Sequence, residues 1–434
     1  MSANAIPAEA FPDRTALERY QRQRLGALLG EIRVRNPFYA RKLGSVSFDP
    51  LADPLEALPF TTRDELQADQ FERPPYGTNL TYSLDRYVRV HQTSGTQGRP
   101  LRWLDTDESW AWWRRCWMHV LCGARVTALD RVLFPFSFGP FIGFWAAFDA
   151  AVELGCLVLP AGGMSTLSRL RHLLDLSATV VVCTPTYALH MAEAAAEHGI
   201  PLASSAVRAV IVAGEPGGSV PAVRRRIEDA WGAEVFDHAG MTEAGAWGFE
   251  SAEARGALRV LETEFIAEVI DPKSGATVPD GTAGELVLTN LGRLGSPVIR
   301  YRTGDLVRLT RGEPVAGRWL ARAEGGVCGR VDDALVIRGV NVFPSAIEGI
   351  LRELDEVAEF QIQVRQVHAL AELELRIEPR AGVDTSGLAE RIARHVRDRL
   401  NVRPKVTLAV PGSLPRFELK SQRVVLGESR TAER

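Results

Sequence analysis

The feature that most constrains the fold is an alternation of short β-rich runs with helical runs between residues 104 and 240. Helical runs are expected over 141–154 and from residues 165, 185 and 221. Strands separated by helices pair in parallel, because each helix returns the chain to the same edge of the sheet. The sequence therefore predicts a layered α/β domain, with strands over 131–135, 156–159, 179–183, 209–212 and 234–237.

The spacing of apolar residues is different before and after this region. Residues 15–45 have helical spacing, and Thr62 with Glu65 predicts a capped helix start. After residue 255, alternating segments separated by Gly, Pro and Asp predict antiparallel strands. These strands are expected over 264–270, 284–289, 298–301 and 305–309.

A compact unit follows from about residue 331, with a strand, a helix, two strands and a second helix. We therefore expect two domains, residues 1–330 and 331–434. The predicted fold class is α/β, with a large N-terminal layered α/β domain that carries an added antiparallel region. A small, mobile α+β domain forms the C-terminus, with a hinge near residues 330–333.

Composition and charge restrict the partners. The 434 residues are 46% hydrophobic and 24% charged, which is typical of globular proteins. The formal charge is −3, so no basic excess favours nucleic acid or an anionic membrane surface. The uncharged run 132–148 is too short to span a membrane and is interrupted by Pro and Gly. Small molecules are the expected partners.

The five cysteines are odd in number and form no C-x-x-C pair, which argues against a disulfide framework and a structural zinc site. The N-terminus has no basic segment followed by an apolar one, so no secretion signal is expected. We expect a cytoplasmic protein. The 51 basic residues include only four lysines, Lys42, Lys273, Lys405 and Lys420.

The strongest local motif is T-S-G-T-Q-G-R-P at 93–100, which follows an extended run. Its glycines let consecutive backbone N–H groups converge on an anion, and its hydroxyls add donors, so the segment is suited to cradling phosphate. The spacing is not that of the Walker loop. A Ser/Thr/Gly surface loop is the alternative interpretation of this segment alone.

Two motifs follow expected strands. D-H-A-G-M-T-E at 237–243 lies past a parallel strand, where open α/β sheets bind ligands, and Thr242 with Glu243 suits phosphate and Mg²⁺. A helix-capping turn would have the same residues. In Y-R-T-G-D at 301–305, Asp305 can accept hydrogen bonds from two ribose hydroxyls, although a hairpin turn with an ion pair is equally consistent.

Two late motifs complete the set. G-R-V-D-D at 329–333 leads into R-G-V-N-V-F-P at the expected domain boundary, where a hinge is favoured. L-P-R-F-E-L-K-S at 414–421 carries Lys420, whose point charge suits a transferring phosphate or carboxylate. A solvated lysine near the end of the chain is the alternative interpretation.

Together and in this order, the motifs resemble those of the adenylate-forming enzymes, over residues 15–425. The phenylacetate-CoA ligases are the branch most similar, because of the short chain and the segments A-G-E-P at 213–216, C-T-P-T-Y at 183–187 and R-G-V-N-V-F-P-S at 338–345. The resemblance implies that a carboxylic acid attacks ATP to give an acyl-adenylate and pyrophosphate. The small domain then rotates, and the thiol of coenzyme A displaces AMP.

The resemblance also implies roles for single residues. Thr242 contacts the α-phosphate, Glu243 binds Mg²⁺, and Lys420 bridges the acid and the α-phosphate. Asp332 is the hinge, and Gly339 borders the tunnel for coenzyme A. The residues implied to bind ATP or AMP are Ser94, Gly95, Thr96, Gly98, Gly214, Glu215, Pro216, Asp237, His238, Asp305 and Arg330.

The sequence departs from the family pattern at two positions. Arg99 stands where the phosphate loop usually ends in lysine, which changes the donor geometry. Ala239 stands where an aromatic side chain normally stacks near adenine, so His238 or Phe236 must supply that stacking or it is weaker.

For the acid, an aromatic run over 134–148 lies where related ligases form the acyl pocket. Most of these rings are also plausible core residues. The run contains no Lys or Arg, which favours an aromatic monocarboxylic acid such as benzoate, 2-aminobenzoate or phenylacetate. The expected pocket residues are Phe136, Phe141, Tyr187, Ala213 and Gly240.

Two alternatives to a CoA ligase stay open. An adenylating enzyme that transfers its acyl group to a carrier-protein phosphopantetheine or an amine needs the same first-step motifs. A catalytically silent nucleotide-binding homologue is compatible with Arg99 and Ala239, although Glu243, Asp305 and Lys420 argue against it. A monomer or homodimer is expected.

Overall fold

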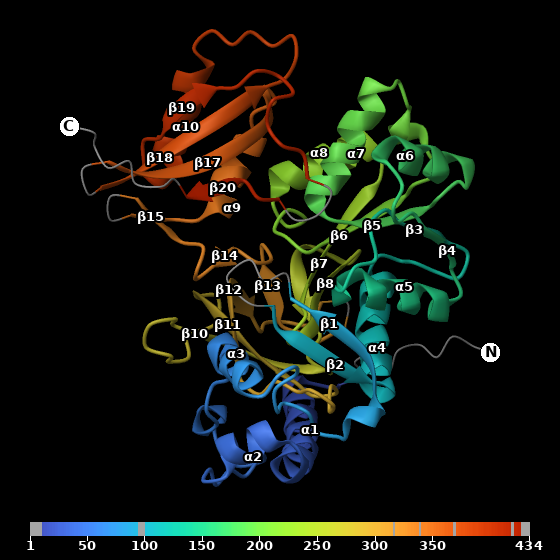
Figure 1. Cartoon of the computed structure of the whole chain (residues 1–434), viewed down its shortest axis with the longest axis vertical. Coiled ribbons are helices and arrows are strands. Elements are labelled where there is room, and N and C mark those ends of the chain that lie inside the picture. The colour runs from blue at the N-terminus through green and yellow to red at the C-terminus, as the bar shows by residue number, and fades with distance from the viewer. Residues whose placement is uncertain are drawn as a thin grey trace.

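The computed structural model describes residues 11–93, 100–315, 317–337, 340–367, 370–417 and 421–426. A large N-terminal domain with a broad sheet carries a smaller C-terminal α+β domain, which packs beside helices α7 (Pro185–Glu197) and α8 (Pro221–Trp231) (Figure 1). The expected α/β fold class is confirmed.

The front of the chain is helical, as predicted. Helix α1 (Arg14–Arg35) is followed by α2 (Pro37–Leu43) and α3 (Arg63–Glu72). Thr62 and Glu65 form the expected capping box at the start of α3, each side chain binding the backbone of the other. Short 3₁₀ turns lie at Leu55–Ala57, Leu84–Arg86 and Leu202–Ser204.

The five predicted parallel strands are present, in the order β4-β3-β5-β6-β7. The helices between them are α5 (Ile142–Leu154), α6 (Thr166–Asp175), α7 and α8, and α4 (Asp107–Gly123) precedes the first strand. The strands are β3 (Arg131–Phe134), β4 (Leu157–Pro160), β5 (Val180–Cys183), β6 (Ala209–Ala213) and β7 (Glu234–Met241).

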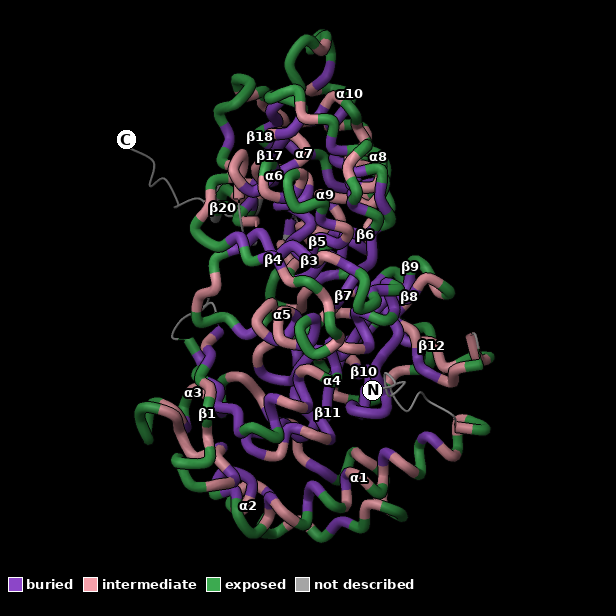
Figure 2. Tube along the Cα trace, turned by 90° about the vertical axis from the view of Figure 1, so that its right-hand side faces the viewer, coloured by how far each residue is buried: buried purple, intermediate pink, exposed green. Residues whose placement is uncertain are grey.

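Alternate residues of these strands enter two different cores. Val180, Val182 and Ile211 pack with α4 and α5 on one face of the sheet. Val181 and Val210 pack with α6, α7 and α8 on the other face. Burial on both faces explains why β5 and β6 are continuous apolar runs (Figure 2).

From β7 onward the same sheet continues with antiparallel strands, in the order β7-β8-β9-β13-β12-β11-β10. A short strand, β14 (Gly329–Arg330), pairs with β12 at its side. The strands are β8 (Gly245–Ser251), β9 (Ala254–Val260), β10 (Phe265–Ile270), β11 (Ala283–Asn290), β12 (Tyr301–Thr310) and β13 (Arg322–Glu324).

One strand prediction in this region is wrong. The sequence suggested separate strands over 298–301 and 305–309, whereas the structure has one strand, β12. Gly304 lies inside it with φ of 74°, and the register against β11 shifts at this point. A bulge formed by a glycine, not a turn, therefore interrupts the alternation of the sequence.

The small domain begins with a hairpin of β15 (Leu335–Ile337) and β16 (Val340–Val342). Helices α9 (Pro344–Arg352) and α10 (Leu388–Leu400) then pack on a sheet of order β19-β18-β17-β20. Strands β17 and β18 match the predicted pair, while β19 and β20 were not predicted. The four strands are β17 (Val357–Val367), β18 (Leu370–Pro379), β19 (Lys405–Leu408) and β20 (Val424–Leu426).

The uncharged run 132–148 becomes strand β3, a connection and the first half of α5. Among the described residues, no helix has the length and apolar character that crossing a membrane requires.

Candidate active site

The segments on either side of the phosphate-loop motif in the sequence pair as a two-stranded hairpin, formed by β1 (Tyr87–Gln92) and β2 (Arg102–Thr106). Thr93 and Leu101 close its base, since each donates its backbone N–H to the other residue, at 2.9 and 3.0 Å. The hairpin therefore fixes both ends of the loop. Ser94, Gly95, Thr96, Gly98 and Arg99 themselves lie outside the described residues.

Thr242 and Glu243 follow the end of β7, and a buried arginine holds their backbone. Nη1 of Arg293 donates to the carbonyl oxygens of Thr242 and Glu243, at 2.6 and 3.2 Å. The same guanidinium forms two 2.7 Å bonds with the carboxylate of Asp105, on β2. Arg293 thus connects the hairpin of the phosphate loop to the Thr242–Glu243 turn.

The Arg293–Asp105 pair is fully buried, with both side chains 0% exposed. The rings of Trp103 and Trp113 lie 5.1 and 5.2 Å from the guanidinium carbon, so cation–π contacts surround the charge. Sequence reasoning missed both residues of this pair. Neither lies in a motif, and 188 positions separate them in the chain.

Glu243 fits the expected role of a magnesium ligand. Its side chain is 6% exposed, and Nη1 of Arg63 lies 4.0 Å from its carboxylate. Within the described ranges, no group of three His, Cys, Asp or Glu residues is arranged to hold a metal ion. A single carboxylate suits Mg²⁺ that is bound mainly by substrate phosphates and water, rather than in an all-protein cage.

The A-G-E-P segment follows β6, where Gly214 turns the chain with φ of 95°. Glu215 is half-buried and accepts two backbone hydrogen bonds, from Thr186 N at 2.9 Å and Ser421 N at 2.7 Å. Pro216 is exposed beside it. The carboxylate of Glu215 therefore contacts two other segments of the chain directly.

Asp237 faces inward from β7 and accepts a hydrogen bond from the hydroxyl of Ser219. Position 218, beside this carboxylate, requires glycine, because a Cβ there would lie 2.5 Å from the carboxylate of Asp237. Burial raises the pKa of Asp237 to about 6, and Glu250 adds to the increase, while Ser219 opposes it. Through its bond to Ser219, Asp237 fixes the position of the segment that follows A-G-E-P.

His238 is buried and neutral. Burial lowers its pKa to about 4, although the carbonyl of Gly248, 2.7 Å from Nδ1, favours the protonated ring. Because a carbonyl only accepts, Nδ1 carries the proton and Nε2 keeps its lone pair. The ring packs 4.2 Å from that of Trp117. Phe236 packs against Arg255, so both proposed substitutes for adenine stacking have other partners.

The expected ribose and hinge residues lie together. Nη1 of Arg330 binds Asp305 at 2.8 Å, and Nε binds Asp332 at 3.0 Å. Burial lowers the pKa of Arg330, but the carboxylates of Asp305, Asp332 and Asp333 outweigh it and raise that pKa above its ordinary value. A Cβ on Gly304 would lie 3.0 Å from this guanidinium, so the bulge gives it room. Gly339 and Lys420 lie outside the described residues.

The predicted pocket residues do not all lie in one place. Phe136 packs against Phe138 and Phe144, with ring centres 4.8 and 4.3 Å apart. Phe141 lies apart from these rings, 44% exposed at the start of α5. Tyr187 lies in the core on the other face of the sheet, where its hydroxyl accepts a 2.6 Å bond from Arg169.

The remaining two pocket residues flank the strand ends. Ala213 pairs with His238 across β6 and β7, and Gly240 pairs with Ala246 of β8. Because β3, β5, β6 and β7 are parallel, Phe136 follows the same sheet edge as Ala213. The structure thus brings Phe136, Ala213 and His238 to one edge, and it leaves Tyr187 behind the sheet.

Removing the charge of Asp105 tests the buried pair. Asp105→Asn leaves the guanidinium of Arg293 buried without an anion, which costs about 3–5 kcal/mol of unfolding free energy. We expect denaturant titration to measure this loss. The control is Asp398→Asn, which removes a pair with side chains 50% and 57% exposed. The control should change stability by about 0.5 kcal/mol or less; equal losses would contradict the account.

The raised pKa of Asp237 predicts a pH effect on stability. Between its ordinary value of 3.8 and about 6, the folded chain holds a proton that the unfolded chain releases. Stability from this group therefore falls as pH rises through that window, and Asp237→Asn should remove the fall. His238 contributes in the opposite direction over a similar range, because its folded pKa is lowered.

The measurement is the free energy of unfolding at pH 4.5 and pH 7. The free energy of unfolding of Asp237→Asn, minus that of wild type, should be about 2 kcal/mol higher at pH 7 than at pH 4.5. An identical pH dependence for variant and wild type would show that Asp237 does not titrate in this window.

Comparisons with known proteins agree with this geometry. Residues 54–292 match the family model described as AMP-binding enzyme, and residues 339–426 match the AMP-binding enzyme C-terminal domain. The sequence is 31% identical to a phenylacetate-coenzyme A ligase of Thermus thermophilus, over 96% of this chain and 98% of that protein. A phenylacetate-coenzyme A ligase of Pseudomonas putida is 30% identical, with 94% and 93% covered.

Among solved structures, 2-hydroxyisobutyryl-CoA ligase is similar in two states. In the postadenylation state with 2-HIB-AMP, the TM-score is 0.88 at 29% identity, covering 95% of this chain and 89% of that one. In the thioesterification state with 2-HIB-AMP and CoA, the TM-score is 0.72 at 29% identity, covering 96% and 91%. The arrangement of this chain is therefore closer to the postadenylation state.

Proposed function

The chain belongs to the AMP-binding enzyme family and is an AMP-forming CoA ligase, and we propose that the acid it activates is an aromatic monocarboxylate. ATP and coenzyme A are its other substrates. The acid forms an aryl-adenylate and pyrophosphate, and the thiol of coenzyme A then displaces AMP to give the aryl-CoA thioester.

The observation that carries the aromatic proposal is the ring cluster around Phe136. Phe138 joins it in the connection after β3, and Phe144 and Phe148 join it from α5. Phe136 itself lies just beyond the end of β3. This is the same edge as Ala213 and His238. Flat rings suit a flat aromatic guest, since aromatic pairs favour edge-to-face and offset contacts.

The lack of positive charge on His238 and on the clustered rings at this edge of the sheet favours an acid with a single carboxylate. His238 is neutral at physiological pH because burial lowers its pKa to about 4. The clustered rings contribute no cation. A second carboxylate would therefore be desolvated without a partner, which is costly.

We propose the following roles in the first step. A carboxylate oxygen of the acid attacks the α-phosphorus of ATP, and pyrophosphate leaves with the electron pair of the broken P–O bond. The Thr242 hydroxyl orients the α-phosphate, and Asp305 with Arg330 holds the ribose. Lys420 stabilises the charge between acid and phosphate. Glu243 would hold Mg²⁺, which neutralises phosphate charge when bound.

In the second step, the thiol sulfur attacks the acyl carbon, AMP leaves, and the thiol proton is released to solvent. We propose that Asp332 is the hinge between the two arrangements. In support, β14 ends at Arg330 within the sheet of the large domain, and β15 of the small domain begins at Leu335. Asp332 contacts Arg330 between them, at 3.0 Å.

The test of the substrate is a panel of acids, with pyrophosphate and thioester measured with and without coenzyme A. Benzoate, 2-aminobenzoate or phenylacetate should support both products. Phthalate, a benzoate with a second carboxylate, should lose at least about tenfold in kcat/KM. Medium-chain fatty acids are the aliphatic comparison.

Each other outcome assigns a different function. Turnover with fatty acids alone would overturn the aromatic proposal. Pyrophosphate release without thioester would indicate a carrier protein or an amine as acceptor. A chain that releases no pyrophosphate with any acid would be the silent homologue.

Lys420→Ala separates the two half-reactions. We expect pyrophosphate release to fall below detection, because Lys420 is proposed to supply the charge that bridges acid and phosphate, while coenzyme A is still consumed from a presynthesised aryl-adenylate. The control is Lys405→Ala, which removes a lysine that is 67% exposed on β19. Equal loss of both half-reactions in Lys420→Ala would contradict its assignment to the first step.

A further inference from the structure

We propose that Glu215 is a positioning residue for adenylate formation, which joins the small domain to the large one through Ser421. The Glu215 bridge is defined as Thr186–Glu215–Ser421. This inference rests on the proposed function and deepens it, because it assigns a residue to one of the two domain arrangements.

The bridge uses both oxygens of one carboxylate. Oε1 accepts the backbone N–H of Thr186 at 2.9 Å, and Oε2 accepts that of Ser421 at 2.7 Å. Thr186 lies in the first turn of α7, where backbone N–H groups have no partner within the helix. A carboxylate is favoured at this end of a helix, so α7 orients Glu215 from the large domain.

The other half of the bridge belongs to the small domain. Ser421 directly follows Lys420 in the sequence, and β20 begins three residues later at Val424. Fixing the N–H of Ser421 therefore fixes the chain immediately after the lysine. A hydrogen bond between a backbone N–H and an ionised carboxylate is stronger than one between neutral groups.

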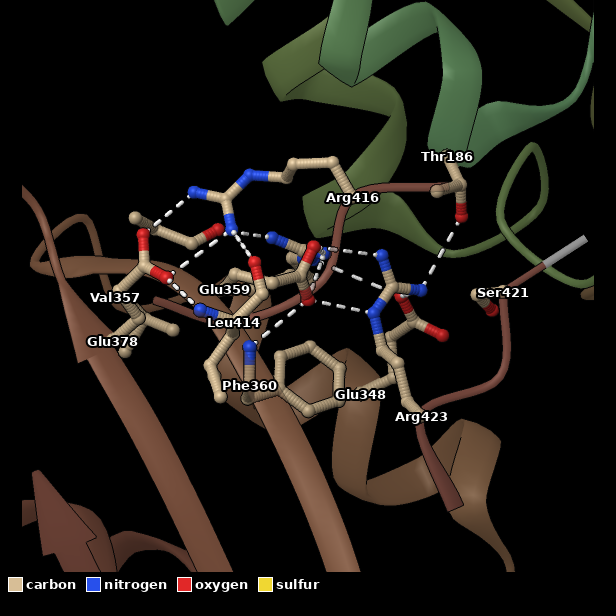
Figure 3. Close-up of polar contacts among 12 residues, drawn as sticks. Thr186, Glu348, Val357, Glu359, Phe360, Glu378, Leu414, Arg416, Ser421 and Arg423 are labelled. Atoms are coloured by element: carbon tan, nitrogen blue, oxygen red, sulfur yellow. Dashed lines mark hydrogen bonds and ion pairs between the residues drawn. The ribbon is translucent and has the colours of Figure 1, made fainter. Parts of the chain in front are cut away.

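A second contact supports the same junction. Nη1 of Arg423 lies 3.3 Å from the hydroxyl of Thr186, and Figure 3 shows this guanidinium between α7 and the small domain. Arg423 also forms ion pairs with two carboxylates of the small domain, Glu348 at 3.1 Å and Glu359 at 2.7 Å. Thr186 thus binds Glu215 through its backbone N–H and Arg423 through its side-chain hydroxyl.

These contacts differ in what domain rotation does to them. The pairs of Arg423 with Glu348 and Glu359 lie within the small domain, so they move together. The bonds of Ser421 to Glu215 and of Arg423 to Thr186 cross between domains, so rotation breaks them. Because the described arrangement is closer to the postadenylation state than to the thioesterification state, the bridge belongs to the first step.

The bridge and an adenine contact predict different kinetics. An adenine-binding Glu215 would change the affinity for ATP. A bridging Glu215 instead changes how often the segment after Lys420 is in place, which alters kcat of the first step and not ATP binding.

The experiment measures both half-reactions and ATP binding in Glu215→Ala. We expect pyrophosphate release to lose about tenfold in kcat. The Kd for ATP and coenzyme A consumption from a presynthesised aryl-adenylate should stay within about twofold of wild type. Glu215→Gln keeps one acceptor oxygen, so it should give a smaller loss of the same pattern, and it replaces the alanine variant if that variant does not fold.

The matched control is Thr184→Ala. Thr184 caps the same helix by accepting from Tyr187 N at 3.1 Å, without being part of the bridge. If Glu215 acted only by capping α7, Thr184→Ala would reproduce the loss in the first step. We expect it to lower the melting temperature and leave the ratio of the two half-reactions unchanged.

Three results would overturn the inference: equal loss of both steps in Glu215→Ala, a weaker Kd for ATP in proportion to the lost activity, or the same step-specific loss in Thr184→Ala. Failure of the proposed function is distinguishable from these, because wild type itself would then release no pyrophosphate with any acid.

Discussion

The buried pair of Arg293 and Asp105 is the interaction on which the geometry of the site depends. Two charges that are 0% exposed cost desolvation energy, which their mutual attraction and four further contacts of the guanidinium offset. Apolar residues of the same volume could fill this space without that cost. They could not bind a carboxylate on β2 and two carbonyls after β7 at once. The pair therefore sets the position of the phosphate-loop hairpin relative to Thr242 and Glu243.

The Arg293–Asp105 pair and the Glu215 bridge act on different parts of the site. The first joins residues of the large domain only, so movement of the small domain does not itself break it. The second crosses between domains and depends on their arrangement. A ligase that runs two reactions at one site benefits from both kinds of contact, since one keeps the nucleotide-binding segments in position and the other can differ between the two steps. The Arg330 guanidinium binds both Asp305, on β12 of the large domain, and Asp332, in the segment that leads to the small domain.

Much of the fold was predictable because local patterns agree with the tertiary structure. Buried parallel strands such as β5 and β6 are apolar runs, which is why their positions could be predicted. The motif at 237–243 was expected to bind a ligand because it lies at the end of a predicted parallel strand. The bulge at Gly304 was not predictable, because a glycine in an alternating run has the composition of a turn. Strands β19 and β20 are short and are stabilised by pairing with β18 and β17, which local sequence does not encode.

Side-chain partners were predicted less well than positions. Tyr187 follows a strand end as expected, but its side chain points into the core behind the sheet, where Arg169 binds its hydroxyl. Glu215 belongs to the A-G-E-P segment, and its partners Thr186 and Ser421 are 29 and 206 positions away. Arg293 belongs to no motif. In each case the deciding contact joins segments distant in the sequence, so no spacing rule could have found it.

In the proposed reaction, one site forms an aryl-adenylate before it forms a thioester. The most direct test is a single turnover with excess enzyme, ATP labelled at the α-phosphate, and phenylacetate, quenched before and after coenzyme A is added. We expect labelled aryl-adenylate before the addition, and its conversion to labelled AMP and aryl-CoA afterwards. Labelled ADP as the product, or thioester formation without a labelled adenylate, would contradict the proposed reaction.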